Sequence, residues 1–274
     1  MILGLSSYTY GWAVGVRGHE LDCPLDEHGL LDRCREHDIK LLQIGDNLPL
    51  HTFDAARLDR LAARAALDGV QLEVGARGLT LKRVAEYSTI ARRLNAKLIR
   101  FVIDDTGYHP SSEAIRVVLR QCAPLLDGLV LGIENHDRFP AAELRSIIES
   151  AGSDQIGICL DTANSYGVGE GIETVAAILA PLTVNLHIKD FSFQRLPHLM
   201  GFTVTGCPAG AGFLNLSALL ETLAPYGRCA TAVLELWTPP ETQLEKTIAK
   251  EAAWAAQSLR FLKSHFGKNI QRCC

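Results

Sequence analysis

The feature that most constrains the fold is a regular alternation of short apolar runs with longer amphipathic segments along the whole chain. The runs have the length of β-strands, and the segments between them repeat apolar residues at helical spacing. This order predicts parallel strands joined by crossover helices. The expected strands are residues 2–7, 40–45, 70–75, 97–103, 129–134, 155–161, 182–189 and 230–236. The expected helices are residues 25–37, 52–68, 80–95, 111–126, 141–150, 172–180, 216–224 and 242–264.

Eight such strand and helix pairs predict an α/β fold, a single (β/α)8 TIM barrel. An open doubly wound sheet is the structural alternative, but it needs a glycine-rich phosphate turn after the first strand, and SSYTYG at 6–11 is a poor one. No linker rich in proline, glycine, serine or charge divides the chain. We therefore expect one barrel domain over residues 1–268 and a tail at 269–274 that is disordered or foreign to the natural chain.

The composition of the chain argues against nucleic acid and membranes as binding partners. The chain of 274 residues is 47% hydrophobic and 21% charged with a net charge of −4, and it has no basic stripe of the kind that binds nucleic acid. Its amino terminus lacks the pattern of a signal peptide, and no apolar run reaches the length of a membrane span. Its eight cysteines form no C-x-x-C pair and are expected to be reduced thiols. We expect a cytoplasmic protein that binds neither nucleic acid nor membrane.

The stretch VNLHIKD at 184–190 predicts a buried strand with one polar face. Side chains alternate along a strand, so Asn185, His187 and Lys189 share one side and apolar residues occupy the other. A strand that is buried on both faces normally reads as a continuous apolar run. Polar groups inside a barrel are costly unless they bind something. This strand therefore predicts a ligand site inside the barrel.

The ends of the later strands carry further polar residues, and catalytic groups in such barrels lie at the carboxyl ends of strands. The fifth expected strand ends at Glu134, the sixth at Asp161 and the eighth at Glu235, while His187 lies on the seventh. The alternation of side chains directs all four inward. Carboxylates with one imidazole suit Mn²⁺ best, with Mg²⁺, Co²⁺ or Zn²⁺ as alternatives. For any one of these residues an ordinary strand-end role, such as capping the next helix, is the better interpretation, but four at one level of successive strands predict a metal site.

The motifs GIENH (132–136), GICLDTANSYG (157–167), NLHIKD (185–190), PAGAGFLN (208–215) and LELW (234–237) resemble the xylose-isomerase-like superfamily of sugar and sugar-phosphate isomerases and epimerases. The resemblance covers almost the whole chain. It implies that Glu134, Asp161, His187 and Glu235 bind the metal ion. It also implies that Glu134 and Glu235 move the substrate proton while the ion stabilises an enediolate.

Other residues are expected to contact the substrate. Lys189 shares the inward face of His187 and is a candidate to neutralise an enediolate oxygen or a substrate carboxylate; a lysine that only emerges at the mouth is the alternative. The segment 191–215 is expected to fold over the mouth as a lid. Glu73 is expected to pair with Arg77 or Arg100. The expected substrate contacts are His136, Asn164, Arg195, His198, Tyr8, Trp12 and Trp237.

The first functional hypothesis is therefore a metal-dependent isomerase or epimerase of a keto sugar or sugar phosphate. The chain departs from the 3-epimerases, which have a proline-containing turn where Asn135 and His136 follow Glu134. The alternative is a decarboxylase of a 3-oxo sugar acid, 3-oxo-isoapionate-like, or an inosose-type dehydratase with the same site, because Lys189, Arg195 and His198 are candidates to hold a carboxylate. An endonuclease of the same superfamily and an inactive barrel are less favoured. The resemblance also implies a homo-oligomer.

Overall fold

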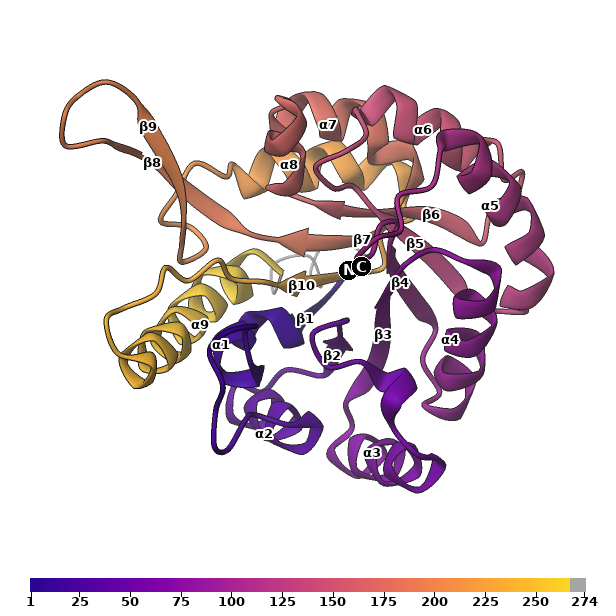
Figure 1. Ribbon diagram of the computed structural model, residues 1–274, viewed down its shortest axis with the longest axis horizontal. Helices are drawn as coiled ribbons and strands as arrows, with labels where there is room; N and C mark the ends of the chain where they lie inside the picture. The colour runs from indigo at the N-terminus through magenta and orange to yellow at the C-terminus, as the bar shows by residue number, and fades with distance from the viewer. Residues whose placement is uncertain (267–274) are drawn as a thin grey trace, which may run out of the picture.

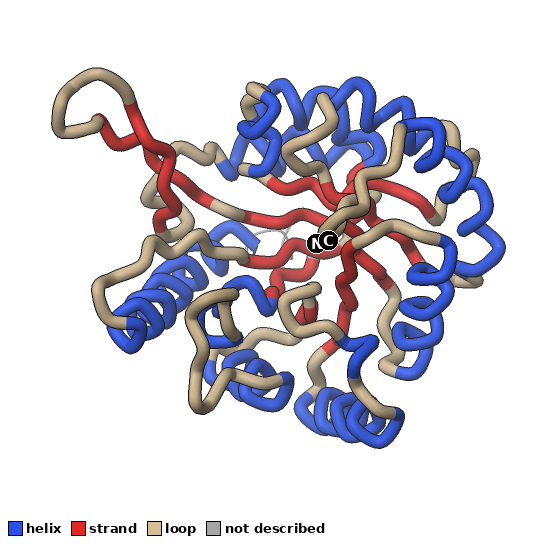
Figure 2. Tube along the Cα trace, in the orientation of Figure 1, coloured by secondary structure: helices blue, strands red, loops and turns tan. Residues whose placement is uncertain are grey.

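The computed structural model describes residues 1–266, and eight parallel strands close into a barrel inside a ring of helices (Figures 1 and 2). The order around the barrel is β1-β10-β7-β6-β5-β4-β3-β2, and β1 pairs with both β2 and β10. The predicted (β/α)8 barrel is confirmed. The bounds of its strands are β1 Ile2–Ser6, β2 Leu41–Ile44, β3 Gln71–Arg77, β4 Leu98–Val102, β5 Val130–Glu134, β6 Ile156–Asp161, β7 Thr183–Ile188 and β10 Thr231–Leu234.

A helix follows most of these strands and packs its apolar face on the barrel. The main helices are α2 Glu27–Glu36, α3 Ala55–Asp68, α4 Leu81–Arg93, α5 Ser112–Leu126, α6 Ala141–Glu149, α7 Ile172–Leu179, α8 Leu216–Leu223 and α9 Leu244–Phe266. Their starts follow ordinary capping chemistry: the Ser111 side chain accepts from the backbone N–H of Ala114. Gly69 ends α3 in the left-handed conformation, with φ of 64°, which glycine adopts at little cost.

Two features between strands were not predicted. A short helix α1, Gly11–Val14, follows β1 and a 3-10 turn at Ser7–Tyr10. The segment expected to form a lid instead forms an antiparallel hairpin of β8 (Asp190–Arg195) and β9 (Phe202–Cys207), which projects beyond the ring of helices in Figure 1. The lid prediction is therefore wrong for most of this segment, because alternating apolar and polar residues in both arms favour strand pairing.

The base of the hairpin is held by one buried carboxylate. Asp190 Oδ2 accepts from the backbone N–H groups of Gly210 and Gly212, and Oδ1 accepts from those of Phe191 and Leu214. Glycine is needed at position 212, because a Cβ there would clash with Asp190 Oδ1. This carboxylate therefore positions the glycine-rich segment beside the barrel mouth.

No helix among residues 1–266 combines the length and apolarity needed to cross a bilayer. The domain bounds 1–268 stay a prediction, and the expected tail at 269–274 lies outside the described residues.

Candidate active site

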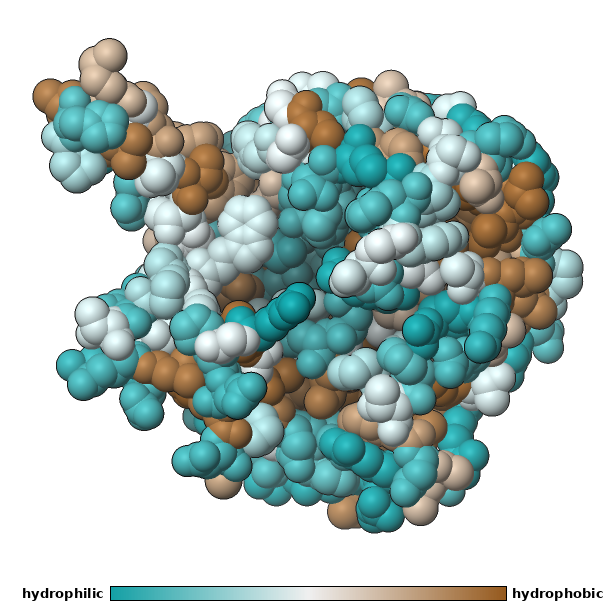
Figure 3. Space-filling view, viewed as in Figure 1, coloured by the Kyte–Doolittle hydropathy of each residue, from teal (hydrophilic) through white to brown (hydrophobic). Residues whose placement is uncertain are grey.

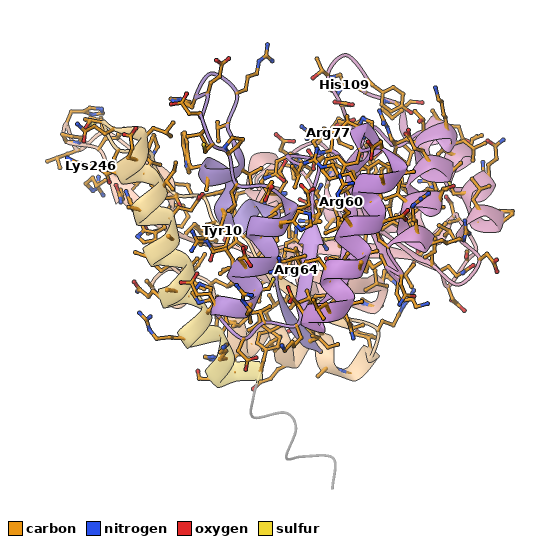
Figure 4. All side chains as sticks on the ribbon, turned by 90° about the horizontal axis from the view of Figure 1, so that it is seen from below. Tyr10, Arg60, Arg64, Arg77, His109 and Lys246 are labelled. Atoms are coloured by element: carbon orange, nitrogen blue, oxygen red, sulfur yellow. The ribbon has the colours of Figure 1, made fainter. Side chains whose placement is uncertain are left out.

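A pocket of about 490 Å³ opens at the carboxyl ends of the barrel strands. Figure 3 shows a hollow in this face with mostly hydrophilic surface around it, and Figure 4 places Arg77 at the same end of the molecule. Buried acidic and basic side chains form its floor, and aromatic side chains form part of its wall. Its polar and aromatic lining includes Tyr8, Asp46, Arg77, Arg100, Glu134, His136, Asn164, Tyr166, Lys189, Glu235 and Trp237.

The four predicted ligands lie close together at the base of this pocket, where Glu134 and Glu235 line it and His187 and Asp161 lie behind them. Glu134 ends β5, Asp161 ends β6, His187 lies in β7, and Glu235 directly follows β10. His187 Nδ1 lies 3.2 Å from Glu235 Oε1, 3.6 Å from Glu134 Oε2 and 3.9 Å from Asp161 Oδ2. All four side chains are buried. Two ligands that bind one ion at about 2.1 Å lie roughly 3–4 Å apart, so these distances from His187 suit a bound ion. Asp161, His187 and Glu235 form one group with ligand atoms within 4.8 Å of one another, and Glu134 forms a second group with His187 and Cys159.

The unused atoms of this cluster support the same interpretation. Asp161 Oδ1 accepts from the backbone N–H of Ala163 and Asn164, and Glu235 Oε1 accepts from Ser6 Oγ. His187 Nδ1 is buried without a hydrogen-bond partner, whereas Asp161 Oδ2 and Glu235 Oε2 contact the Lys189 ammonium. Buried polar atoms are normally paired, and an unpaired imidazole nitrogen that lies among three carboxylates suits a metal ligand. The residues present therefore fit a divalent ion.

The charge of the cluster also favours a bound cation. Glu134, Asp161, Glu235 and the neighbouring Asp46 supply four negative charges. Three cations lie among them: Arg100 contacts both Glu134 and Asp46, Arg77 lies 3.4 Å from Asp46, and Lys189 contacts Asp161 and Glu235. One negative charge is left without compensation. Buried charge is tolerated where it is paired or binds metal, so this surplus favours a bound cation.

Electrostatics within the cluster keep Lys189 and Glu235 charged. Burial lowers the pKa of Lys189, but Asp161 at 2.7 Å and Glu235 at 2.9 Å outweigh burial and raise it. Burial raises the pKa of Glu235, but His187 and Lys189 hold that pKa well below its usual range. Burial lowers the pKa of His187, but the nearby Glu235 and Glu134 carboxylates outweigh burial, so the net effect raises that pKa. The cluster therefore attracts positive charge to the side of His187 that carries Nδ1.

Several predicted substrate contacts do line the pocket. Asn164 Nδ2 donates to Glu134 Oε1 at 2.8 Å, so it also orients a predicted ligand. Tyr8 donates to Asp46, and Trp237 lies with its ring 5.6 Å from Lys189 Nζ. His136 is half-exposed at the pocket and pairs with the neighbouring Asp137.

Three predicted contacts lie elsewhere. Trp12 lines an adjacent cavity of about 390 Å³, and its ring N–H donates to the backbone carbonyl of Thr238. Arg195 and His198 lie at the far end of the β8–β9 hairpin, where Arg195 donates to the backbone carbonyl of Leu199 and stacks on Phe202. Neither lines the pocket. Their placement as substrate contacts is wrong within this chain, because the hairpin carries its tip outward.

Sequence reasoning missed residues from the first half of the barrel. Arg100 on β4 and Asp46 after β2 adjoin the predicted ligands, and Arg77 at the end of β3 lines the pocket. The parity of Arg100 within the apolar run LIRFV was the available signal. The predicted pairing of Glu73 with Arg77 or Arg100 is wrong. Glu73 instead accepts from Thr231 and Gln43 inside the barrel.

Comparison with known proteins gives the family. The profile of the xylose isomerase-like TIM barrel matches residues 31–265. The chain belongs to this family. It is 32% identical over 264 residues to the 3-oxo-isoapionate decarboxylase of Pectobacterium atrosepticum, covering 96% of this chain and 95% of that protein.

Two solved structures share the fold of this xylose isomerase-like barrel. One is a xylose isomerase-like TIM barrel protein from Mycobacterium smegmatis in complex with magnesium, with a TM-score of 0.68, 15% identity and coverage of 94% of this chain and 96% of that one. The other is D-psicose 3-epimerase with D-tagatose from Clostridium cellulolyticum H10, with a TM-score of 0.70, 14% identity and coverage of 97% and 99%. At these identities the likeness shows the fold alone. The family and the enzyme relative together indicate that this chain is an enzyme.

Proposed function

We propose that the protein is a divalent-metal-dependent enzyme that decarboxylates a 3-oxo sugar acid. The observation that carries the proposal is the cluster of three buried carboxylates around the unpaired His187 Nδ1, beneath a pocket that also presents cationic side chains. The 32% identical decarboxylase, aligned over nearly its full length, supports the choice of reaction.

Glu134, Asp161, His187 and Glu235 would hold the ion. When bound, it supplies a Lewis acid that stabilises negative charge on the keto oxygen. In the reaction the bond between the carboxylate carbon and its neighbour breaks, and the electron pair passes to the keto group as CO₂ leaves. The Lys189 ammonium lines the same pocket, and its positive charge stabilises the negative charge that develops on the keto oxygen. A proton from water in the open pocket then completes the product carbon.

Arg77 is the side chain that we assign to the substrate carboxylate. Its Nε lies 3.4 Å from Asp46 Oδ2, but Asp46 is engaged more closely by Arg100 and Tyr8. Arg77 therefore keeps donors for a substrate anion, and a guanidinium matches the geometry of a carboxylate. Trp237 and Tyr8 give the carbon chain an aromatic wall.

The second candidate is the isomerase or epimerase that the sequence favoured. Glu134 and Glu235 both line the pocket, as removal and return of a proton would require, and D-psicose 3-epimerase has the same fold. We rank it second because the 32% identical relative is a decarboxylase, whereas the epimerase shares the fold at only 14% identity. Decarboxylation needs no base. Mn²⁺ as the ion, a homo-oligomer and a cytoplasmic location stay predictions.

One pair of assays separates the two reactions. Purified protein with Mn²⁺ is given 3-oxo sugar acids, and released CO₂ is measured. In parallel it is given keto sugars in D₂O, and deuterium incorporation is followed by NMR. We expect CO₂ without exchange into keto sugars. Exchange into a keto sugar without CO₂ from any 3-oxo acid would favour the epimerase instead.

A further inference from the structure

A layer of buried polar side chains lies inside the barrel beneath the candidate metal ligands. Gln43 comes from β2, Glu73 from β3, Asn185 from β7 and Thr231 from β10. All are at least nine-tenths buried, and none lines the main pocket. Such a layer is costly unless hydrogen bonds satisfy it and the arrangement serves a purpose. Neither the fold nor the proposed reaction yet accounts for it.

The layer connects to the site through one hydrogen bond. Gln43 Oε1 lies 2.7 Å from His187 Nε2, on the side of the imidazole ring that faces away from the carboxylates. On its other side, Gln43 Nε2 donates to Glu73 Oε2 at 2.9 Å and to Asn185 Oδ1 at 3.2 Å. Gln43 is therefore the link between the polar layer and the imidazole.

The other bonds of the layer decide which way the Gln43 amide faces. The Thr231 hydroxyl donates to Glu73 Oε1 at 2.7 Å, so its oxygen is free to accept from Asn185 Nδ2 at 2.8 Å. That bond directs the Asn185 carbonyl oxygen toward Gln43. Glu73 and Asn185 thus each present an acceptor oxygen to Gln43. The Gln43 NH₂ group must donate to both, so the Gln43 carbonyl oxygen faces His187.

We propose that Glu73 and Gln43 are positioning residues that fix the tautomer of His187. With the Gln43 oxygen opposite, Nε2 carries the proton and donates it, so Nδ1 presents a lone pair to the carboxylate cluster. A group that orients a ligating histidine in this way typically changes metal affinity about ten- to a hundredfold when it is removed. The inference rests on the proposed metal site.

The first test uses the wild-type protein loaded with Zn²⁺, which is diamagnetic. Histidine labelled with ¹⁵N is followed by NMR, and the His187 signals are assigned by their loss in His187→Gln. We expect the proton on Nε2 and a metal-bound shift on Nδ1. A proton on Nδ1 with Nε2 toward the ion would overturn the proposal.

The second test measures affinity for Co²⁺ by calorimetry. Gln43→Leu removes the acceptor, and we expect binding about ten- to a hundredfold weaker than in the wild type. The exchange variant Gln43→Glu with Glu73→Gln returns an acceptor to His187 and a donor to position 43, so we expect affinity close to that of the wild type. Equal affinity in Gln43→Leu and the wild type would refute the role of Gln43.

A control separates loss of the hydrogen bond between Gln43 and His187 from a general loss of stability. Ser258→Ala on α9 removes a buried hydrogen bond from the backbone N–H of Ala209, and neither residue lines the pocket or contacts Gln43, so the change should lower stability and leave Co²⁺ affinity unchanged. If the wild type itself binds no divalent ion, the metal site is wrong. If the wild type binds the ion and Gln43→Leu binds it equally well, the metal site stands and only the positioning role of Gln43 is wrong.

Discussion

Each carboxylate of the site is held by different neighbours, and this sets what it can do. Glu235 lies against Lys189, His187 and Ser6, whereas Glu134 lies against Arg100 and Asn164. Neither side chain is free to rotate away, so both present an oxygen to His187 Nδ1. Preorganisation of this kind is what a catalytic ion needs.

Replacing one of these ligands tests the site directly. Glu235→Gln removes a negative charge and a ligand atom but keeps the shape of the side chain. We expect turnover to fall by at least about a hundredfold and Co²⁺ affinity to fall with it, because a neutral amide is a poorer ligand. Steady-state kinetics and calorimetry measure the two effects. Full activity in Glu235→Gln and in Glu134→Gln would refute the assigned roles.

Arg77 tests the class of substrate. A hydrogen bond to a charged group contributes about 1.5–3 kcal/mol, so Arg77→Leu should raise KM for a 3-oxo sugar acid about ten- to a hundredfold and change kcat little. Arg195→Leu is the matched control, because that arginine lies on the hairpin tip and should leave KM unchanged. An unchanged KM in Arg77→Leu would mean that the carboxylate binds elsewhere.

At the scale of elements, a buried carboxylate joins the two ends of the chain. Glu251 on α9 accepts from the backbone N–H groups of Trp12 and Ala13 at the start of α1. Its side chain is almost wholly buried, and burial raises its pKa to about 7. The folded protein therefore binds this proton more tightly than the unfolded chain does.

This shift predicts a dependence of stability on pH. The protonated Glu251 stabilises the fold below pH 4.5, and that contribution is lost as the pH rises through about 7. Glu251→Gln cannot ionise, so its free energy of unfolding relative to the wild type should rise by on the order of 3 kcal/mol between pH 4.5 and 8. Urea unfolding at both pH values measures the difference. A difference that does not change with pH would contradict the assignment.

At the scale of the whole molecule, the barrel gathers charge that its own side chains do not balance. The cluster at the mouth keeps one negative charge after Arg77, Arg100 and Lys189 are counted. Because the ligands come from four strands of the barrel, an ion at this point would link the wall from β5 to β10. Metal binding should therefore stabilise the entire fold.

Removal of the ion tests this expectation. At a free metal concentration of one hundred times Kd, binding should add about 2.7 kcal/mol to the free energy of unfolding. Thermal unfolding before and after chelation, with the metal content measured in both samples, gives the comparison. Glu235→Gln should show a smaller difference. An unchanged unfolding temperature after proven metal loss would show that no ion couples to the fold.

The sequence by itself determined the barrel and the inward direction of the four ligands. Both follow from local periodicity: apolar runs and helical spacing define the elements, and alternation along a strand decides the face of Glu134, Asp161, His187 and Glu235. The caps at Ser111 and Gly69 were also local, because they depend on residues only a few positions apart. These properties need no knowledge of distant contacts.

Only the tertiary structure decided which cations and amides complete the site. Arg100 reaches Glu134 across 34 residues of sequence, and Gln43 reaches His187 across 144. It also decided that Arg195 and His198 lie outside the pocket, because the direction of a hairpin depends on what packs at its base. Closing a barrel brings the first and last strands together, and no pattern along the chain encodes which side chains then meet.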